Sequence, residues 1–195
     1  MSELFLAIHL FLHGLMIWGA TRFFRCEGRM PIATRVIYAS SLTALVAGAW
    51  AIAARSGGNV VQDTAATVLA AICVSLFLWA ARTVGRKRLK GAFYADQPTS
   101  IIATGPYRWI RNPFYLFYCL THIFTLIASG CLWLAPLVPW MATLYTAAAL
   151  QEERRFLSGP LCEEYRQYLA RTGRFFPRLH SLLRWGRTAA ATPVR

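Results

Sequence analysis

The sequence predicts an all-α integral membrane protein, a bundle of five transmembrane helices with a cytosolic C-terminal helical segment. Three observations predict this fold. The 195-residue chain is 56% hydrophobic yet carries a net charge of +13, its apolar residues form long uncharged runs, and its basic residues lie between those runs. Disordered chains are poor in apolar and aromatic residues, so disorder is excluded as the main state. The long apolar runs also disfavour a soluble nucleic-acid binder.

The first three uncharged runs each predict one span. They cover residues 4–21, 36–54 and 64–81. Each is long enough to cross a hydrocarbon core of about 30 Å as a helix, and lipid offers no partner to backbone groups, so each run should be helical. Small residues four apart in the second run, including Ala44 and Gly48, predict a helix-packing face.

The fourth uncharged run, residues 112–151, is too long for one span. Gly130 and then two prolines interrupt it. We therefore expect two helices, 112–129 and 131–151, in a tight hairpin that turns near Gly130, with a kink where the prolines fall. The chain then has five spans in one domain, residues 1–195.

The distribution of positive charge tests the number of spans and orients the protein. With five spans, four basic residues of the first loop, seven of the loop after the third span and nine of the C-terminal segment lie on one side. Arg55 alone lies on the other side. Loops rich in Lys and Arg stay in the cytoplasm. The sequence therefore predicts the N-terminus outside, the C-terminus inside, and an inner or plasma membrane.

The C-terminal segment is mostly polar and predicts one more helix. Pro160 precedes Glu163 and Glu164, and both proline and acidic residues favour a helix start. Gly173 suits the end of that helix. Residues 175–185 are amphipathic enough to lie on the membrane surface.

Polar side chains at membrane depth are the first candidates for chemistry. His9 and His13 lie four apart, and because no third ligand is evident, a hydrogen-bonded pair is favoured over a metal pair and no metal site is predicted. The fourth span carries one helical stripe of polar residues. The stripe consists of Tyr115, Tyr118, His122, Thr125 and Ser129. It should face the bundle or a cavity, so either a functional cavity or plain interhelical hydrogen bonding is expected.

Two charged groups flank the last two spans. Arg111 and Asn112 precede Pro113, at a helix start where free N–H groups and an arginine favour an anion; the alternative is contact with lipid headgroups. Glu152 and Glu153 follow the fifth span, where they either pair with nearby arginines or recognise an ammonium group. Together the two groups suit both ends of an amino acid.

One motif runs through these segments in a fixed order. It consists of Gly105-Pro106-Tyr107-Arg108, Arg111-Asn112-Pro113, Tyr115, Glu152-Glu153, Gly159, Glu164-Tyr165, Tyr168 and Phe176-Pro177. Over about residues 80–180 this motif resembles the isoprenylcysteine carboxyl methyltransferase and phospholipid methyltransferase superfamily. Spans 1 to 3 agree with that superfamily only in hydropathy.

The resemblance implies an integral membrane enzyme that uses S-adenosylmethionine at the cytosolic face, in the segments 82–115 and 152–180. The cofactor-binding residues it implies are Thr104, Gly105, Tyr107, Arg111, Asn112, Pro113, Tyr115, Glu152, Glu153, Tyr165 and Tyr168. Arg171 and Arg174 are further candidates for closing the site. The superfamily usually has histidine where Asn112 stands; an amide cannot titrate but still exchanges hydrogen bonds.

The predicted function is methyl transfer from S-adenosylmethionine to a lipophilic or small acceptor, with membrane lipids as partners. Four residues are the predicted catalytic group. They are Arg111, Asn112, Tyr115 and His122, the last as a base for a protonated amine. One alternative is an NADPH-dependent sterol-type reductase, whose C-terminal Cys-Tyr-Tyr pattern Cys162, Tyr165 and Tyr168 also match. The other is a non-enzymatic scaffold that binds anionic lipid. The oligomeric state is left open.

Overall fold

The computed structural model describes residues 1–25, 30–85, 89–90 and 100–178. The surface segment expected over residues 175–185 therefore lies outside the described residues from position 179 onward. The same holds for residues 86–88 and 91–99 of the expected cofactor segment.

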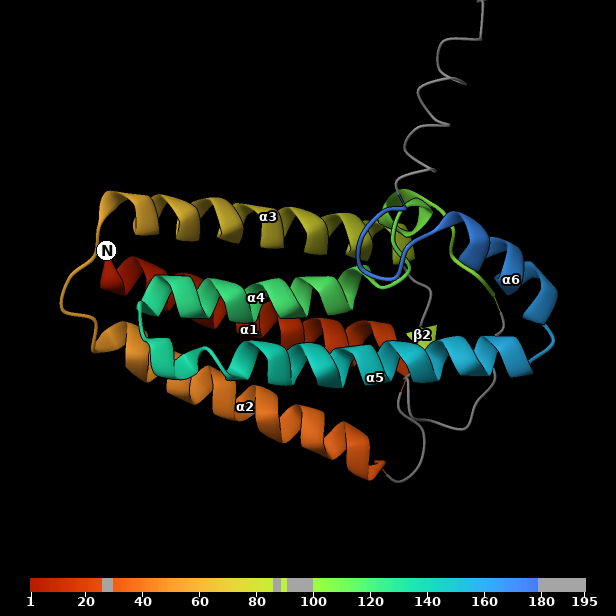
Figure 1. The fold of residues 1–195 in the computed structure, drawn as a ribbon, viewed down its shortest axis with the longest axis horizontal. Helices are drawn as coiled ribbons and strands as arrows, with labels where there is room; N and C mark the ends of the chain where they lie inside the picture. Colours follow the sequence, from red (N-terminus) through yellow and green to blue (C-terminus); the bar gives the residue numbers. More distant parts are fainter. Residues whose placement is uncertain (26–29, 86–88, 91–99, 179–195) are drawn as a thin grey trace, which may run out of the picture.

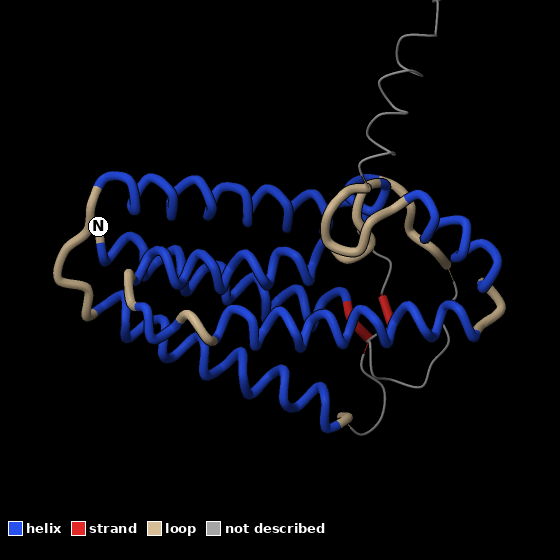
Figure 2. The backbone as a smooth tube through the Cα atoms, viewed as in Figure 1, coloured by secondary structure: helices blue, strands red, loops and turns tan. Residues whose placement is uncertain are grey.

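The described chain is almost entirely helical (Figure 1). Its elements are α1 Ser2–Phe23, β1 Phe24–Arg25, α2 Ile32–Ala53, α3 Val60–Val84, β2 Leu89–Lys90, η1 Gly105–Arg108, α4 Pro113–Ser129, η2 Leu132–Leu134, α5 Leu137–Ser158 and α6 Cys162–Arg171. The strands β1 and β2 are two residues each and pair in parallel. Figure 2 shows that most of the loops lie at the two ends of the bundle. The all-α prediction and the extra C-terminal helix are confirmed.

Each predicted span corresponds to a helix, but helix length supports only four spans among the described residues. The four helices long and apolar enough to cross a membrane are α1, α2, α3 and the segment Leu132–Ser158. The remaining apolar helix, α4, has 17 residues. Pro113 begins it, where the missing N–H costs nothing, and Gly130 ends it in the left-handed conformation, with φ 68°. The hairpin expected near Gly130 is confirmed.

The short helix α4 is the centre of the bundle. It contacts α1, α2, α3 and α5, and Figure 1 shows it between α3 and α5. Eleven of its residues are buried. A helix enclosed by other helices meets little lipid, so polar side chains on it need partners only within the protein.

The predicted packing face of α2 is confirmed at Ala44 and Gly48, which are both buried. A Cβ on Gly48 would lie 2.5 Å from Cγ2 of Thr125 and 2.7 Å from Cε1 of His9. Only glycine therefore allows α2 to approach α1 and α4 this closely. Apolar side chains on the opposite face of α2, such as Val46 and Trp50, are exposed, as expected of a helix that faces lipid.

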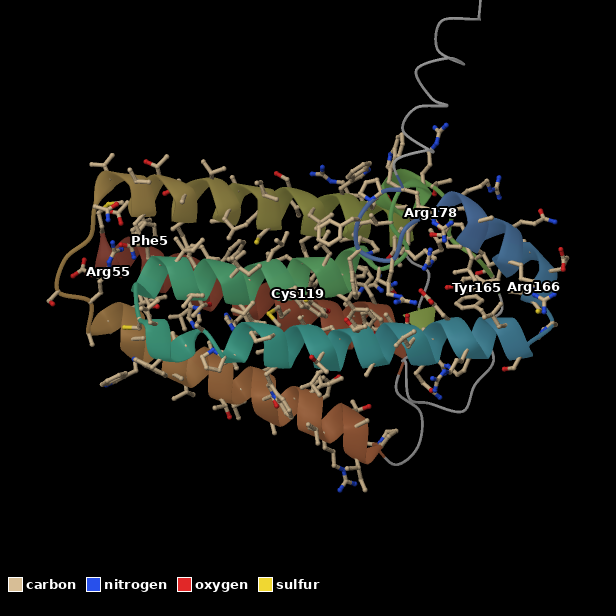
Figure 3. The ribbon with its side chains drawn as sticks, viewed as in Figure 1. Phe5, Arg55, Cys119, Tyr165, Arg166 and Arg178 are labelled. Carbon is tan, nitrogen blue, oxygen red and sulfur yellow. The ribbon has the colours of Figure 1, made fainter. Side chains whose placement is uncertain are left out.

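The bundle has two ends of different construction. Figure 3 shows Phe5 and Arg55 at one end and Tyr165 and Arg166 at the other. We call these the Arg55 end and the Glu153 end, after the charged residue that organises each. The elements η1, the last turn of α5 and α6 lie together at the Glu153 end (Figure 1).

Candidate functional site

Three segments far apart in the sequence meet at the Glu153 end: the loop 104–112, the last turns of α5, and residues 172–174, which we call the strap. Backbone hydrogen bonds join the strap to the loop. Arg111 N donates to Gly173 O at 2.8 Å, Asn112 N to Arg174 O at 3.1 Å, and Gly173 N to Trp109 O at 3.1 Å. The start of α4 is thereby fixed against the C-terminal segment.

Glu153 holds two arginines, and we call this group the Glu153 clasp. Its Oε1 accepts hydrogen bonds from Arg111 Nε at 3.0 Å, Arg111 Nη2 at 2.9 Å and Arg174 Nε at 3.0 Å, and its Oε2 accepts from Arg174 Nη2 at 2.8 Å. Arg111 Nη1 also donates to the carbonyl of Thr172. The hydrogen bond to Glu153 raises the pKa of Arg174. Both carboxylate oxygens of Glu153 are thus committed to arginines.

Glu152, the neighbouring acid, has different surroundings. Its Oε1 accepts one hydrogen bond from the Tyr115 hydroxyl at 2.7 Å, and its carboxylate interacts electrostatically with Tyr107 and Tyr118. The hydroxyls of Tyr107 and Tyr118 are buried and have no hydrogen-bond partner among the described residues. We call Tyr107, Tyr115 and Tyr118 the tyrosine cluster.

Helix α6 contacts both the loop and α5. The hydroxyl of Tyr168 donates to the Tyr107 carbonyl at 2.7 Å, and Tyr165 stacks on Phe156 with ring centroids 4.3 Å apart. Burial raises the pKa of Tyr107 well above its usual value, and the Glu152 carboxylate raises it further. Tyr107 therefore stays a neutral phenol, able to donate a hydrogen bond.

Three other predicted residues lie in the loop or directly after it. Thr104 is the residue before η1, and Pro113 is the buried first residue of α4. Gly105 has φ +56°, and a Cβ there would lie 2.1 Å from Oγ1 of Thr83, so glycine is required for the loop to lie against α3.

Arg171 is exposed and donates to its own helix, at Gln167 O. It does not join the clasp, whereas Arg174 does.

His122 lies apart from the Glu153 end. It follows Tyr115 by seven residues, which is about 10 Å along a helix axis. Its Nε2 lies 3.4 Å from the Tyr145 hydroxyl. The polar stripe of α4 is buried throughout, so its expected orientation towards the bundle is confirmed. Thr125 bonds His9 at 3.0 Å, which fits interhelical hydrogen bonding in that part of the stripe.

Tyr145 is the residue that sequence reasoning missed. It is buried on α5 and stacks on Tyr115 and on His122, with ring centroids 5.9 and 6.2 Å apart. A signal for it exists in the sequence. It precedes Glu152 by seven residues, a spacing that places both on the same side of a helix.

Comparison with known families identifies the kind of protein. A family model described as phospholipid methyltransferase matches residues 61–160. The chain belongs to this phospholipid methyltransferase family. The resemblance found in the sequence is thereby confirmed, and the match includes Arg111, the tyrosine cluster and both acids of α5. Among curated proteins, none matches the chain.

Membership in the phospholipid methyltransferase family implies a membrane-embedded methyltransferase and suggests lipid substrates and S-adenosylmethionine as methyl donor. The described residues fit the cationic parts of that cofactor, because a half-buried carboxylate stands beside two buried phenols with unused hydrogen-bonding capacity. Arg111 also keeps N–H donors for the cofactor's carboxylate. Of the five N–H donors of Arg111, three are used by Glu153 and Thr172.

Proposed function

We propose that this protein transfers a methyl group from S-adenosylmethionine to a lipid or other amphiphilic acceptor at the Glu153 end. One observation carries the proposal: two adjacent acids on α5 have different partners. Among the described residues, Glu153 is saturated by two arginines, whereas Glu152 accepts one phenol hydrogen bond beside two phenols with none. A carboxylate among aromatic rings is a suitable receptor for a cation.

The proposed roles divide between the two acids. The bound cofactor supplies an electrophilic methyl group on a sulfonium. Glu152 and Tyr115 bind the ammonium group, and the rings and hydroxyls of Tyr107 and Tyr118 surround positive charge near it. The two remaining N–H donors of Arg111 bind the carboxylate, with the positive end of α4 behind them. Glu153 positions Arg111.

The remaining candidates act through position. Asn112 holds the strap, because its backbone and side chain both donate to Arg174 O. Tyr168 supports the loop from α6, and Tyr165 packs α6 against α5. The excess of basic residues at the Glu153 end makes this end cytosolic. The acceptor enters sideways from the bilayer towards Tyr118.

The decisive experiment is calorimetric titration of S-adenosylhomocysteine into the detergent-solubilised protein. Glu152→Gln and Arg111→Ala should each weaken binding at least tenfold, about 1.4 kcal/mol. Glu163→Gln is the matched control, since Glu163 lies exposed on α6, and it should bind like the parent protein. Unchanged binding in both test variants would overturn the assignment. Stabilisation against heat by NADPH instead would favour the reductase, and binding of anionic vesicles alone would favour the scaffold.

A further inference from the structure

The histidines in the middle of the bundle lie away from the proposed methyl-transfer site. His9 and His13 are on α1, His122 is on α4, and all three are at most 2% exposed. His9 uses both ring nitrogens, because Nδ1 lies 3.0 Å from Thr125 Oγ1 and Nε2 lies 3.0 Å from Leu45 O. His9 is therefore fully accounted for by helix packing. His13 and His122 are not.

His13 has one ring nitrogen in use. Its Nδ1 lies 3.0 Å from the carbonyl of His9. A carbonyl can only accept, so this nitrogen carries the hydrogen, and in the neutral ring Nε2 is then a bare acceptor. That Nε2 is buried and has no hydrogen-bond partner among the described residues.

The unsatisfied nitrogen of His122 can be a donor, whereas that of His13 is an acceptor. Its Nε2 lies 3.4 Å from the Tyr145 hydroxyl, and that hydroxyl lies 3.3 Å from Ser41 Oγ. With the phenol donating to the imidazole and the serine donating to the phenol, Nδ1 of His122 carries the hydrogen. This Nδ1 is also buried without a partner in the described part of the chain.

We propose that His13 and His122 bind one water molecule between α1 and α4. The water accepts from Nδ1–H of His122 and donates to Nε2 of His13. The two rings meet edge to face with centroids 5.8 Å apart, and neither unsatisfied nitrogen bonds the other. Buried polar atoms are rarely left unsatisfied, and internal waters occur where polar groups in an enclosed site lack partners.

A metal ion suits this pair less well than water does. An ion needs a lone pair from each nitrogen, but Nδ1 of His122 carries a hydrogen whenever Nε2 accepts from Tyr145. No group of three or more His, Cys, Asp and Glu side chains arranged to hold a metal is found among the described residues. The water instead links α1 to the stack of His122, Tyr145 and Tyr115.

The test compares amide replacements that keep one ring position each, measured by thermal unfolding in detergent. His122→Asn keeps a donor at the Nδ1 position and His13→Gln keeps an acceptor at the Nε2 position. Each should unfold at a higher temperature than its mismatched control, His122→Gln or His13→Asn. The reverse order in either pair would overturn the proposal.

A second measurement keeps the proposal testable where a variant does not fold. A high-resolution density map of the parent protein should show a single water-sized peak within hydrogen-bond distance of both nitrogens. A dry contact or an empty gap between the rings would overturn the proposal. In addition, His13→Leu and His122→Leu should be non-additive, because both remove the same water. Additive losses in unfolding temperature would show that the two nitrogens are independent.

Discussion

The two ends of the bundle each contain a buried arginine paired with an acid, and they differ in how far the pairing reaches. At the Arg55 end, Arg55 Nη2 donates to Asp63 at 2.6 Å and Nε donates to Gly57 O at 2.6 Å. Its guanidinium also lies over the Phe5 ring, 5.5 Å from the centroid. Apart from Phe5, these partners lie within the connection between α2 and α3 and the start of α3, so the pairing closes one loop.

At the Glu153 end, one carboxylate joins residues 42 and 21 positions away in the sequence, Arg111 and Arg174. The pairing therefore decides how the loop, α5 and the strap lie together, and it leaves Glu152 beside the tyrosine cluster. The comparison teaches that an arginine–carboxylate pair has different consequences at the two places. A pair between residues close in the sequence stabilises a connection, and a pair between distant residues shapes a site.

The largest expected effect comes from Glu153→Ala. It leaves Arg111, whose side chain is 7% exposed, as a buried charge without its partner, which typically costs about 3 to 5 kcal/mol. Denaturant unfolding in detergent measures the loss. The control is Glu163→Ala, which removes a 3.9 Å ion pair between exposed side chains and should cost about 0.5 kcal/mol or less. Similar losses in the two variants would mean that the Glu153 clasp stabilises the fold no more than an exposed ion pair does.

Two glycine substitutions, one at each end of the bundle, test how tightly the backbone is packed there. A Cβ on Gly173 would lie 1.6 Å from the backbone oxygen of Phe176, whereas one on Gly58 would lie 1.7 Å from the Nη2 end of the Arg55 side chain. A backbone cannot yield as a side-chain end can. Gly173→Ala should therefore cost about 2 to 3 kcal/mol and Gly58→Ala about 1 kcal/mol. Unfolding measurements on both variants check the order, and only Gly173→Ala should weaken S-adenosylhomocysteine binding.

The helices could be predicted from the sequence because charged residues and glycine mark where the apolar runs end. The flanking charges located the first three helices to within four residues at each end, and Gly130 marked the hairpin. Hydropathy could not show that α4 is enclosed by four other helices. An apolar run looks the same whether lipid or protein covers it, and only the polar stripe indicated the buried position of α4.

The candidate site was predictable in its residues but not in their pairing. Arg111 and both acids stood out by type and place, yet the sequence did not distinguish Glu152 from Glu153. Adjacent residues on a helix point about 100° apart, so which acid meets Arg111 depends on how α5 is rotated against α4. Arg174 ranked low for a similar reason, because its place in the clasp depends on the path of the strap after α6.

A moderate effect is expected from Asp63→Ala at the Arg55 end. The Arg55 side chain is 6% exposed and keeps its bond to Gly57 O, while Asp63 is more exposed, at 21%. The loss should be about 1 to 2 kcal/mol, less than for a fully buried pair. Affinity for S-adenosylhomocysteine should stay that of the parent protein, because the change lies at the far end of the bundle. Weaker binding would show that the two ends are coupled.

The smallest effect is expected from Asn112→Ala, although Asn112 stands where the superfamily usually has histidine. The main bond to the strap comes from its backbone N, 3.1 Å from Arg174 O, and alanine keeps that bond. The side-chain bond to the same oxygen is long, at 3.5 Å, and the side chain makes no capping bond to α4. Unfolding should show a loss of about 0.5 kcal/mol, and S-adenosylhomocysteine affinity should change by less than about twofold, 0.4 kcal/mol. A tenfold loss of affinity with normal stability would instead place the Asn112 amide on the cofactor, and the strap would then be only the frame that holds it there.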